Sequence, residues 1–228
     1  MTRETLDRQI HHIQDEVLLL GSMVEQAMLK SVDALKRRDL KASRTLYEED
    51  ALINEKRFAI ENAILILIAT QQPMARDLRS LAAMLEVITE LERMGDYAKG
   101  IGKVNIRLGD HTIPIPYREI DLMADLAVSM LHRSLSAFIN EDAGQASAIP
   151  LEDDKVDDLY NHVTRSLVNA MIANPENIDA ANLLMWVAHN LERMADRVTN
   201  ICERTVFIAT GELLELESND DDLDDDRE

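Results

Sequence analysis

The chain has 228 residues, of which 46% are hydrophobic and only 4% aromatic, and it carries a formal net charge of −19. This charge argues against a nucleic-acid-binding surface, which requires clustered Lys and Arg, and the single cysteine excludes an intrachain disulfide. The charged start and the short longest apolar run, residues 63–69, give no signal peptide and no membrane span, so we expect a cytoplasmic protein without direct membrane insertion.

The first part of the chain, residues 1–109, predicts three helices. Apolar residues recur every three or four positions over residues 10–31, which is the pattern of an amphipathic helix. Asp39 is placed to cap a second helix, and Pro73 suits the first turn of a third, where the missing N–H costs nothing. The third helix is expected to end near Gly109.

The segment 110–117 contains two prolines, Pro114 and Pro116, and predicts a linker because proline cannot continue a helix. A second set of three helices follows. They are expected over residues 118–139, over residues 141–173, and from Asn174-Pro175 to about Gly211.

The two halves share sequence motifs. The phrase Leu-Glu-Arg-Met-x-Asp occupies residues 91–96 and, one hundred residues later, residues 191–196, while EDALINE at 49–55 matches EDDKVDD at 152–158. These matches predict an all-α fold of two tandem, pseudo-symmetric, antiparallel three-helix bundles with six helices. The predicted domains are 1–109 and 118–211, joined by the linker 110–117.

The remaining segment, residues 212–228, holds ten acidic residues and one arginine and so carries −9 of the net charge. Such a run is typically solvated and disordered. A specific acidic docking or metal-buffering tail is the alternative.

Each copy of the repeated phrase places a glutamate and an aspartate four residues apart, on one face of a helix. Like charges at this spacing repel, so a cation is needed to compensate them. The cation is either an arginine, with Arg93 and Arg193 as candidates, or a metal ion held by the carboxylate oxygens. On a helical wheel the pairs flank the core, which places such an ion near the surface.

The second copy has the longer polar stripe on its helix, formed by His189, Glu192, Asp196, Asn200 and Glu203. In the first copy, Gly100 and Lys103 follow Asp96, so the two sites need not be equal.

Taken together, LERMGD and LERMAD, EEDALIN and EDDKVDDLY, and the stretch QQPMARDLRSLAAMLEVITELERMGD closely resemble the PhoU family over nearly the whole chain. The resemblance implies a regulator rather than an enzyme, one that represses the phosphate-starvation response. It implies two partners, the ATPase subunit of the phosphate ABC transporter and a phosphate-responsive sensor histidine kinase. A homodimer is also expected, and no nucleic acid.

The resemblance further implies surface sites for multinuclear iron or zinc clusters, or for another divalent metal. The family motif falls on Glu92, Asp96, Glu192 and Asp196, and we add the middle-helix residues Asp50, Asn54, Asp153 and Asp157, together with Asn200. Gly100 departs from the asparagine that the family often has there, and Lys99 and Lys103 weaken the first site further.

Two other functions remain open at this point. One is a carboxylate-rich metal-storage or di-iron-type metalloenzyme bundle, which the flank position and the lack of Glu-x-x-His pairs disfavour. The other is a scaffold whose acids only pair with Arg93 and Arg193. Cys202, Trp186 and most methionines are expected in the core.

Overall fold

The structure of the protein is a computed structural model that describes residues 3–109, 111 and 113–216. This part of the chain is built from helices and contains no β-strand, so the predicted all-α class is confirmed. The predicted tail from residue 217 onward lies outside the described residues. In chain order the elements are α1 (Arg3–Arg37), α2 (Leu40–Gln71), α3 (Arg76–Leu108), α4 (Tyr117–Asn140), α5 (Ala143–Ala148), the 3-10 helix η1 (Pro150–Glu152), α6 (Asp153–Ala173), the 3-10 helix η2 (Pro175–Asn177) and α7 (Ile178–Thr210).

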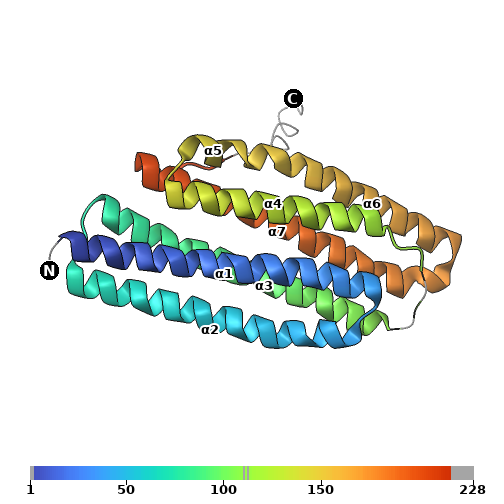
Figure 1. Cartoon of the computed structure of the whole chain (residues 1–228). Helices are drawn as coiled ribbons and strands as arrows, with labels where there is room; N and C mark the ends of the chain where they lie inside the picture. The colour runs from blue at the N-terminus through green and yellow to red at the C-terminus, as the bar shows by residue number, and fades with distance from the viewer. Residues whose placement is uncertain (1–2, 110, 112, 217–228) are drawn as a thin grey trace, which may run out of the picture.

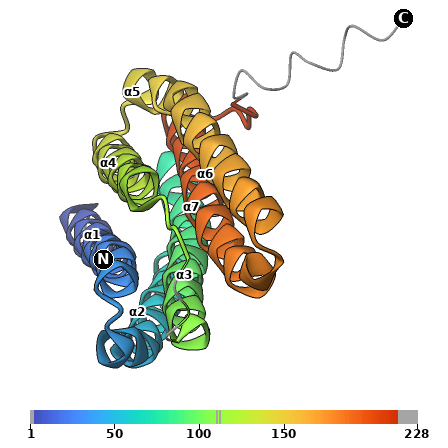
Figure 2. The ribbon, with the colours of Figure 1, turned by 90° about the vertical axis from the view of Figure 1, so that its right-hand side faces the viewer.

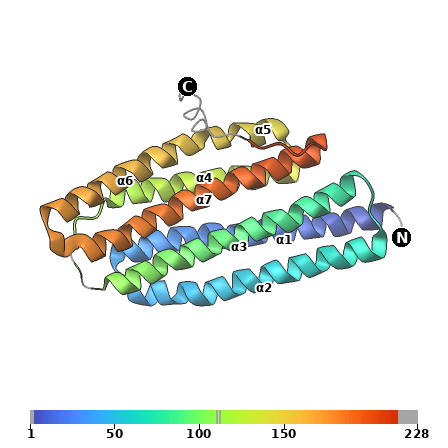
Figure 3. The same ribbon diagram turned by 180° about the vertical axis from the view of Figure 1, so that it is seen from behind.

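The long helices run side by side in an elongated bundle (Figure 1). α1, α2 and α3 pack on one another in the first half, and α4, α6 and α7 do so in the second. The view along the bundle shows these two groups of helices as neighbouring stacks (Figure 2). From behind, α3 and α7 are seen next to each other and running in opposite directions, and they form an extensive contact between the halves (Figure 3).

The helix boundaries of the first half follow from local chemistry. Asp39 caps α2 as predicted, because its Oδ1 accepts hydrogen bonds from the backbone N–H groups of Lys41 and Ala42, each at 2.9 Å. The prediction for Pro73 was wrong. α3 begins only at Arg76, and Pro73 directly follows the left-handed C-cap Gln72, a position where proline commonly stops the preceding helix.

The predicted fifth helix, residues 141–173, is interrupted in the structure. α4 ends at Asn140, and its C-cap Glu141 has a positive φ of 52°. Asp142 then caps the short helix α5 by accepting from the backbone N–H of Gln145. Pro150 opens η1, and α6 starts at Asp153. Proline has no N–H to donate within a helix, which is the physical reason for this break. The six-helix scheme holds when α5, η1 and α6 are taken together as the fifth helix.

The last helix begins where the sequence indicates. The side chain of Asn174 accepts from the backbone N–H of Glu176, Pro175 opens the one-turn helix η2, and α7 continues from Ile178. α7 ends at Thr210, and its C-cap Gly211 adopts the left-handed conformation common at helix C-termini.

One continuous apolar core connects the two halves. Leu91 and Met94 on α3 are fully buried, and so are their counterparts Leu191 and Met194 on α7. Burying an aliphatic side chain of this size stabilises the fold by roughly 1.5–3 kcal/mol. The repeated phrase therefore supplies core residues from both halves at the same contact.

α4 is long and apolar enough to cross a membrane by length and composition alone. Half of its most apolar window is buried inside the protein, however, and the helix packs on α1, α6 and α7. Its apolar residues, such as Met123, Ala127 and Met130, belong to the core. The bundle itself accounts for the hydropathy of this helix.

Cys202 is buried in the core, as predicted. Burial, followed by the nearby Glu203, raises the pKa of this thiol to about 12, while Arg133 acts in the opposite direction. The thiolate form that binds metals is therefore suppressed at neutral pH. Trp186, in contrast, was wrongly assigned to the core, because 55% of its surface is exposed.

Candidate metal centre

The two acidic pairs lie beside the contact of α3 with α7. Glu92 and Asp96 follow the buried Leu91 on α3, and Glu192 and Asp196 follow Leu191 on α7. Asp96 is exposed, whereas the other three carboxylates are half-buried. The pairs thus flank the core, at the position that helical spacing indicates.

Contacts between α3 and α7 are related by an internal two-fold symmetry. The side-chain amide of Asn200 donates to Glu90 Oε2 at 3.1 Å, and, in the reverse order, Asn190 lies against Gly100. Glu86 of α3 and Arg204 of α7 form an ion pair across the same contact, with 3.1 Å between Oε2 and Nη1. These pairs are placed at equal distances along the two helices from Gly95 and Ala195. The centre of the contact therefore falls inside the repeated phrase.

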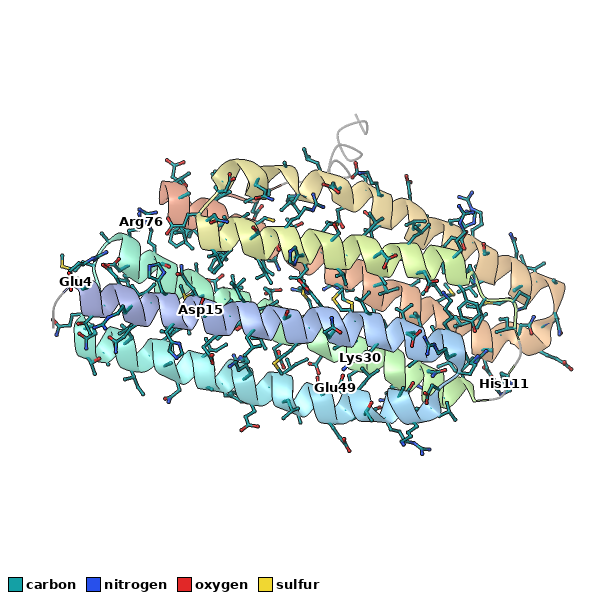
Figure 4. All side chains as sticks on the ribbon, in the orientation of Figure 1. Glu4, Asp15, Lys30, Glu49, Arg76 and His111 are labelled. Atoms are coloured by element: carbon teal, nitrogen blue, oxygen red, sulfur yellow. The ribbon has the colours of Figure 1, made fainter. Side chains whose placement is uncertain are left out.

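The matching acids of the middle helices divide into two roles. Glu49 accepts from Lys30 of α1 at 2.7 Å, and Figure 4 shows the two side chains meeting between α1 and α2. Its counterpart Glu152 accepts from Arg133 of α4 at 2.6 Å, which lowers the pKa of Glu152. These glutamates stabilise the bundle in each half. The aspartates that follow them are directed to the acidic pairs.

In the second half, Asp153 interacts with an acidic cluster. It is only 5% exposed, and its Oδ1 is buried without a hydrogen-bond partner. Burial is the main cause that raises the pKa of Asp153 to about 7, and the charges of neighbouring carboxylates add to it. Those neighbours, in order of effect, are Asp157, Asp196, Glu192 and Asp154.

The pKa of Glu192 on α7 is raised in the same way. Burial raises its pKa to about 7, with further contributions from Asp196 and Asp157 that Arg193 partly offsets. Its buried Oε2 lies 3.3 Å from Nδ1 of His189 but has no hydrogen-bond partner. The pKa values of two carboxyl groups, Asp153 of α6 and Glu192 of α7, are thus raised by burial and by the surrounding acids.

Asp196 completes this second-half cluster, which we define as Asp153, Asp157, Glu192 and Asp196. Burial raises the pKa of Asp196, and Arg193, Arg197 and His189 lower it. The Nη1 atom of Arg193 is 3.7 Å from Asp196 Oδ2, and the guanidinium also hydrogen-bonds Tyr97 of α3. The predicted arginine partner is therefore present, but it is shared with the other half.

The first-half cluster consists of Asp50, Asn54, Glu92 and Asp96, and it contains a lysine. Lys99 Nζ lies 2.7 Å from Asp50 Oδ2 and 2.6 Å from Asp96 Oδ1, so that one ammonium joins α2 to α3. Asn54 donates to the carbonyl and to Oδ2 of Asp50, at 3.1 and 3.3 Å. Oδ1 of the buried Asp50 has no hydrogen-bond partner.

Glu92 has a second cation close by. Burial and Asp96 raise the pKa of Glu92, and Arg57 of α2 is the largest influence that lowers it. Arg57 also pairs with Glu61 at 3.0 Å. Analysis of the sequence did not identify Arg57, although its place seven residues after Asp50, two helical turns along the same face, could have indicated it.

The donor sets fit a hard or borderline metal ion, because carboxylate oxygens are the ligands that such ions prefer. The buried, unpartnered Oδ1 of Asp153 and Oε2 of Glu192 are suited to this role. As the side chains stand, no group of three or more His, Cys, Asp or Glu in the described ranges is arranged to hold a metal. Metal binding would require these side chains to converge.

Asn200, a predicted ligand, has a different contact in the structure. Its amide group and Nη1 of Arg197 both approach Oε2 of Glu90 on α3. Glu90 was not identified from the sequence, because nothing in the repeat marks it as a partner of α7. A metal-binding role for Asn200 stays a prediction.

A comparison with known protein families bears on this repeated architecture. The PhoU domain model matches the chain twice, over residues 17–104 and 120–205. The chain belongs to the PhoU family. The two matches include both acidic pairs and both middle-helix aspartates, so the PhoU domain repeat and the sequence repeat coincide.

Relatives of this PhoU chain match it over nearly its full length. A phosphate-specific transport system accessory protein PhoU homolog from Clostridium acetobutylicum is 32% identical over 217 residues, covering 95% of this chain and 99% of the relative. The crystal structure of the phosphate transport system regulatory protein PhoU from Streptococcus pneumoniae matches with a TM-score of 0.86 and 30% identity, covering 92% of this chain and 100% of that one. The crystal structure of PhoU from Pseudomonas aeruginosa matches with a TM-score of 0.85 and 28% identity, covering 90% of this chain and 99% of that one. The predicted family and fold are confirmed.

Proposed function

We propose that the protein is a negative regulator of phosphate uptake and of phosphate-starvation signalling in the cytoplasm. It binds the ATPase subunit of the phosphate ABC transporter and a phosphate-responsive sensor histidine kinase, and it acts without catalysis. The observation that carries this proposal is the match of both halves to the PhoU domain. The names of the relatives, which describe accessory and regulatory proteins of phosphate transport, support it.

The proposal includes a capacity to bind metal through the acidic clusters. Asp153 and Asp157 of α6 and Glu192 and Asp196 of α7 would hold an iron, zinc or other divalent ion in the second half. The bound ion would supply positive charge where burial and mutual repulsion now disfavour ionised carboxylates. These residues would then tie α6 to α7.

The regulatory part is tested in a strain that lacks the gene. Deletion is expected to raise the activity of a phosphate-starvation phosphatase reporter in phosphate-rich medium, and the wild-type gene is expected to restore repression. Unchanged reporter activity after deletion would contradict a negative regulator. Co-purification of the transporter ATPase subunit and of the kinase with the tagged protein tests the partners separately.

The role of the clusters is tested with the double variant Glu192→Gln, Asp196→Asn. We expect it to lose metal in the purified protein and to weaken repression. Asp158→Asn is the matched control, because Asp158 neighbours the second-half cluster on α6 but is not among the residues assigned to it. Equal metal content in wild type, double variant and control would contradict this assignment.

A further inference from the structure

The two halves share the same helix arrangement but carry differently charged side chains at equivalent positions. In the first half, the ammonium of Lys99 lies between Asp50 of α2 and Asp96 of α3, at 2.7 and 2.6 Å. A cation bridging carboxylates from two helices is the arrangement that a metal ion would create. Here the chain itself supplies the cation.

We propose that Lys99 is a built-in replacement for metal in the first half, so that this protein takes up divalent metal only through the second-half cluster. The inference rests on the metal-binding capacity proposed above and deepens it. It assigns metal binding to one half and a metal-independent role to the other.

The second half lacks the corresponding cations. The position one hundred residues after Lys99 is Thr199, which is neutral. Arg57, which acts on Glu92, lies seven residues after Asp50, whereas the residue seven positions after Asp153 is Tyr160. Both cations of the first half are thus replaced by hydroxyl-bearing side chains.

The second half also has more acidic positions. Asn54 of the first half is replaced by Asp157, and Lys103 by Glu203. A divalent ion entering the first half would meet the ammonium of Lys99 at close range, and this repulsion disfavours binding. In the second half the same ion would meet carboxylates from α6 and α7, where Arg193 lies 3.7 Å from Asp196 and His189 lies 3.3 Å from Glu192 but no lysine joins the two helices in the described contacts.

An independent observation points to a missing cation in the second half. Asp153 is 5% exposed, and its Oδ1 is buried without any hydrogen-bond partner. Its counterpart Asp50 also has a buried Oδ1 without a hydrogen-bond partner, but the other oxygen of Asp50, Oδ2, contacts the ammonium of Lys99 at 2.7 Å. A buried carboxylate without compensation is costly, so Asp153 is the group that a bound cation would satisfy.

The fold offers a reporter for the second half alone. Trp186 is the single tryptophan of the chain, and its ring centroid lies 5.6 Å from that of His189. The Nδ1 atom of His189 is in turn 3.3 Å from Glu192. Metal at the second-half cluster should therefore change the fluorescence of Trp186.

The experiment uses the full chain, freed of metal with a chelator and titrated with Mn²⁺. Equilibrium dialysis counts the ions bound per chain, and Trp186 fluorescence locates them. In the wild type we expect Mn²⁺ binding with a fluorescence change. We expect Asp153→Asn to abolish the Mn²⁺ binding and the fluorescence change. Asp96→Asn should leave the binding and the fluorescence change intact.

Exchanging the residues at the equivalent positions provides the decisive comparison. Lys99→Thr should bind at least one additional ion per chain without a further change in Trp186 fluorescence, whereas Lys99→Arg, which keeps the charge, should not. Thr199→Lys should weaken Mn²⁺ binding in the second half at least tenfold, and Thr199→Gln, which adds size without charge, should not. Circular dichroism and thermal melting verify that each variant is folded.

The outcomes separate this inference from the proposed metal capacity. If neither the wild type nor Lys99→Thr binds Mn²⁺, the metal capacity fails, and the inference fails with it. If the wild type binds Mn²⁺ but Asp96→Asn and Asp196→Asn reduce it equally, only the inference is overturned. A folded Lys99→Thr variant that gains no ion would overturn it as well.

Discussion

At the scale of single residues, the environment of a carboxyl group decides its charge. Asp153 and Glu152 are adjacent in the chain, yet the pKa of Asp153 is raised to about 7 by burial and the pKa of Glu152 is lowered by Arg133. Glu152 therefore acts as the stable anion of an ion pair. Asp153 has an ionised form that destabilises the metal-free fold.

The raised pKa values predict how the stability of metal-free protein depends on pH. Asp153 and Glu192 hold their protons up to about pH 7 in the folded state but lose them near their usual values of 3.8 and 4.5 when unfolded. Between these limits the folded state binds more protons, so the free energy of unfolding falls as the pH rises from about 4 to 7. The contribution of these two groups to stability is fully present below the unfolded pKa values and is lost as the pH rises through the folded ones.

Asp153→Asn is expected to remove part of this dependence. The variant should be more stable than the wild type at pH 8 and little changed at pH 5, because an asparagine side chain carries no charge toward the four carboxylates around this position. Those carboxylates are Asp154 and Asp157 of α6 and Glu192 and Asp196 of α7. Urea unfolding in chelator at both pH values measures the effect, and Asp158→Asn is the control on the same helix. If the free energy of unfolding depended on pH in the same way for Asp153→Asn and for the wild type, the effect assigned to Asp153 would be contradicted.

At the scale of elements, caps and prolines determine where the helices begin and end. Asp39 was recognisable from the sequence because a capping carboxylate acts on N–H groups two and three residues away. Pro73 and Pro150 were harder to interpret. A proline is compatible both with the end of one helix and with the start of the next, and the difference depends on the path of the loop.

Asp39→Ala should destabilise the protein by about 1 kcal/mol, because it leaves two N–H groups at the start of α2 without a side-chain acceptor. For a chain of this size, that corresponds to a fall of roughly 2–4 °C in Tm. Asp33→Ala is the matched control, since Asp33 makes only an exposed i,i+4 pair with Arg37, which is worth about 0.3–0.5 kcal/mol. If thermal melting showed the same fall in Tm for Asp39→Ala and Asp33→Ala, loss of the helix cap could not be the cause of the destabilisation.

At the scale of the whole molecule, the contact of α3 with α7 brings the two repeats together. Glu90 lies at this contact with 16% of its side chain exposed, and it accepts from both Arg197 and Asn200. Glu86, one turn earlier, pairs with Arg204 but is 60% exposed. Ion pairs of one chemical type therefore differ in burial along one helix.

Glu90→Ala should cost roughly 1.5–3 kcal/mol, because it leaves a largely buried guanidinium and an amide without their shared acceptor. Glu86→Ala should cost less than about 1 kcal/mol, as expected for an exposed pair. Urea denaturation monitored by circular dichroism measures the free energy of unfolding of both variants. A loss for Glu86→Ala as large as for Glu90→Ala would mean that burial does not govern this contact.

The sequence by itself determined the helical class, the duplication and the residues that lie on each helix face, because these depend on residue spacing along one helix. It also located the acidic pairs and indicated, through Lys99 and Gly100, that the two halves differ. Tertiary structure alone decided the partners: Lys99 with Asp50, Glu90 with Asn200, and Asp153 with the acids of α7. It also left Trp186 at the surface beside His189. The physical reason is that charge compensation and burial act through space between helices, and residue spacing within one helix carries no information about which other helix will face it.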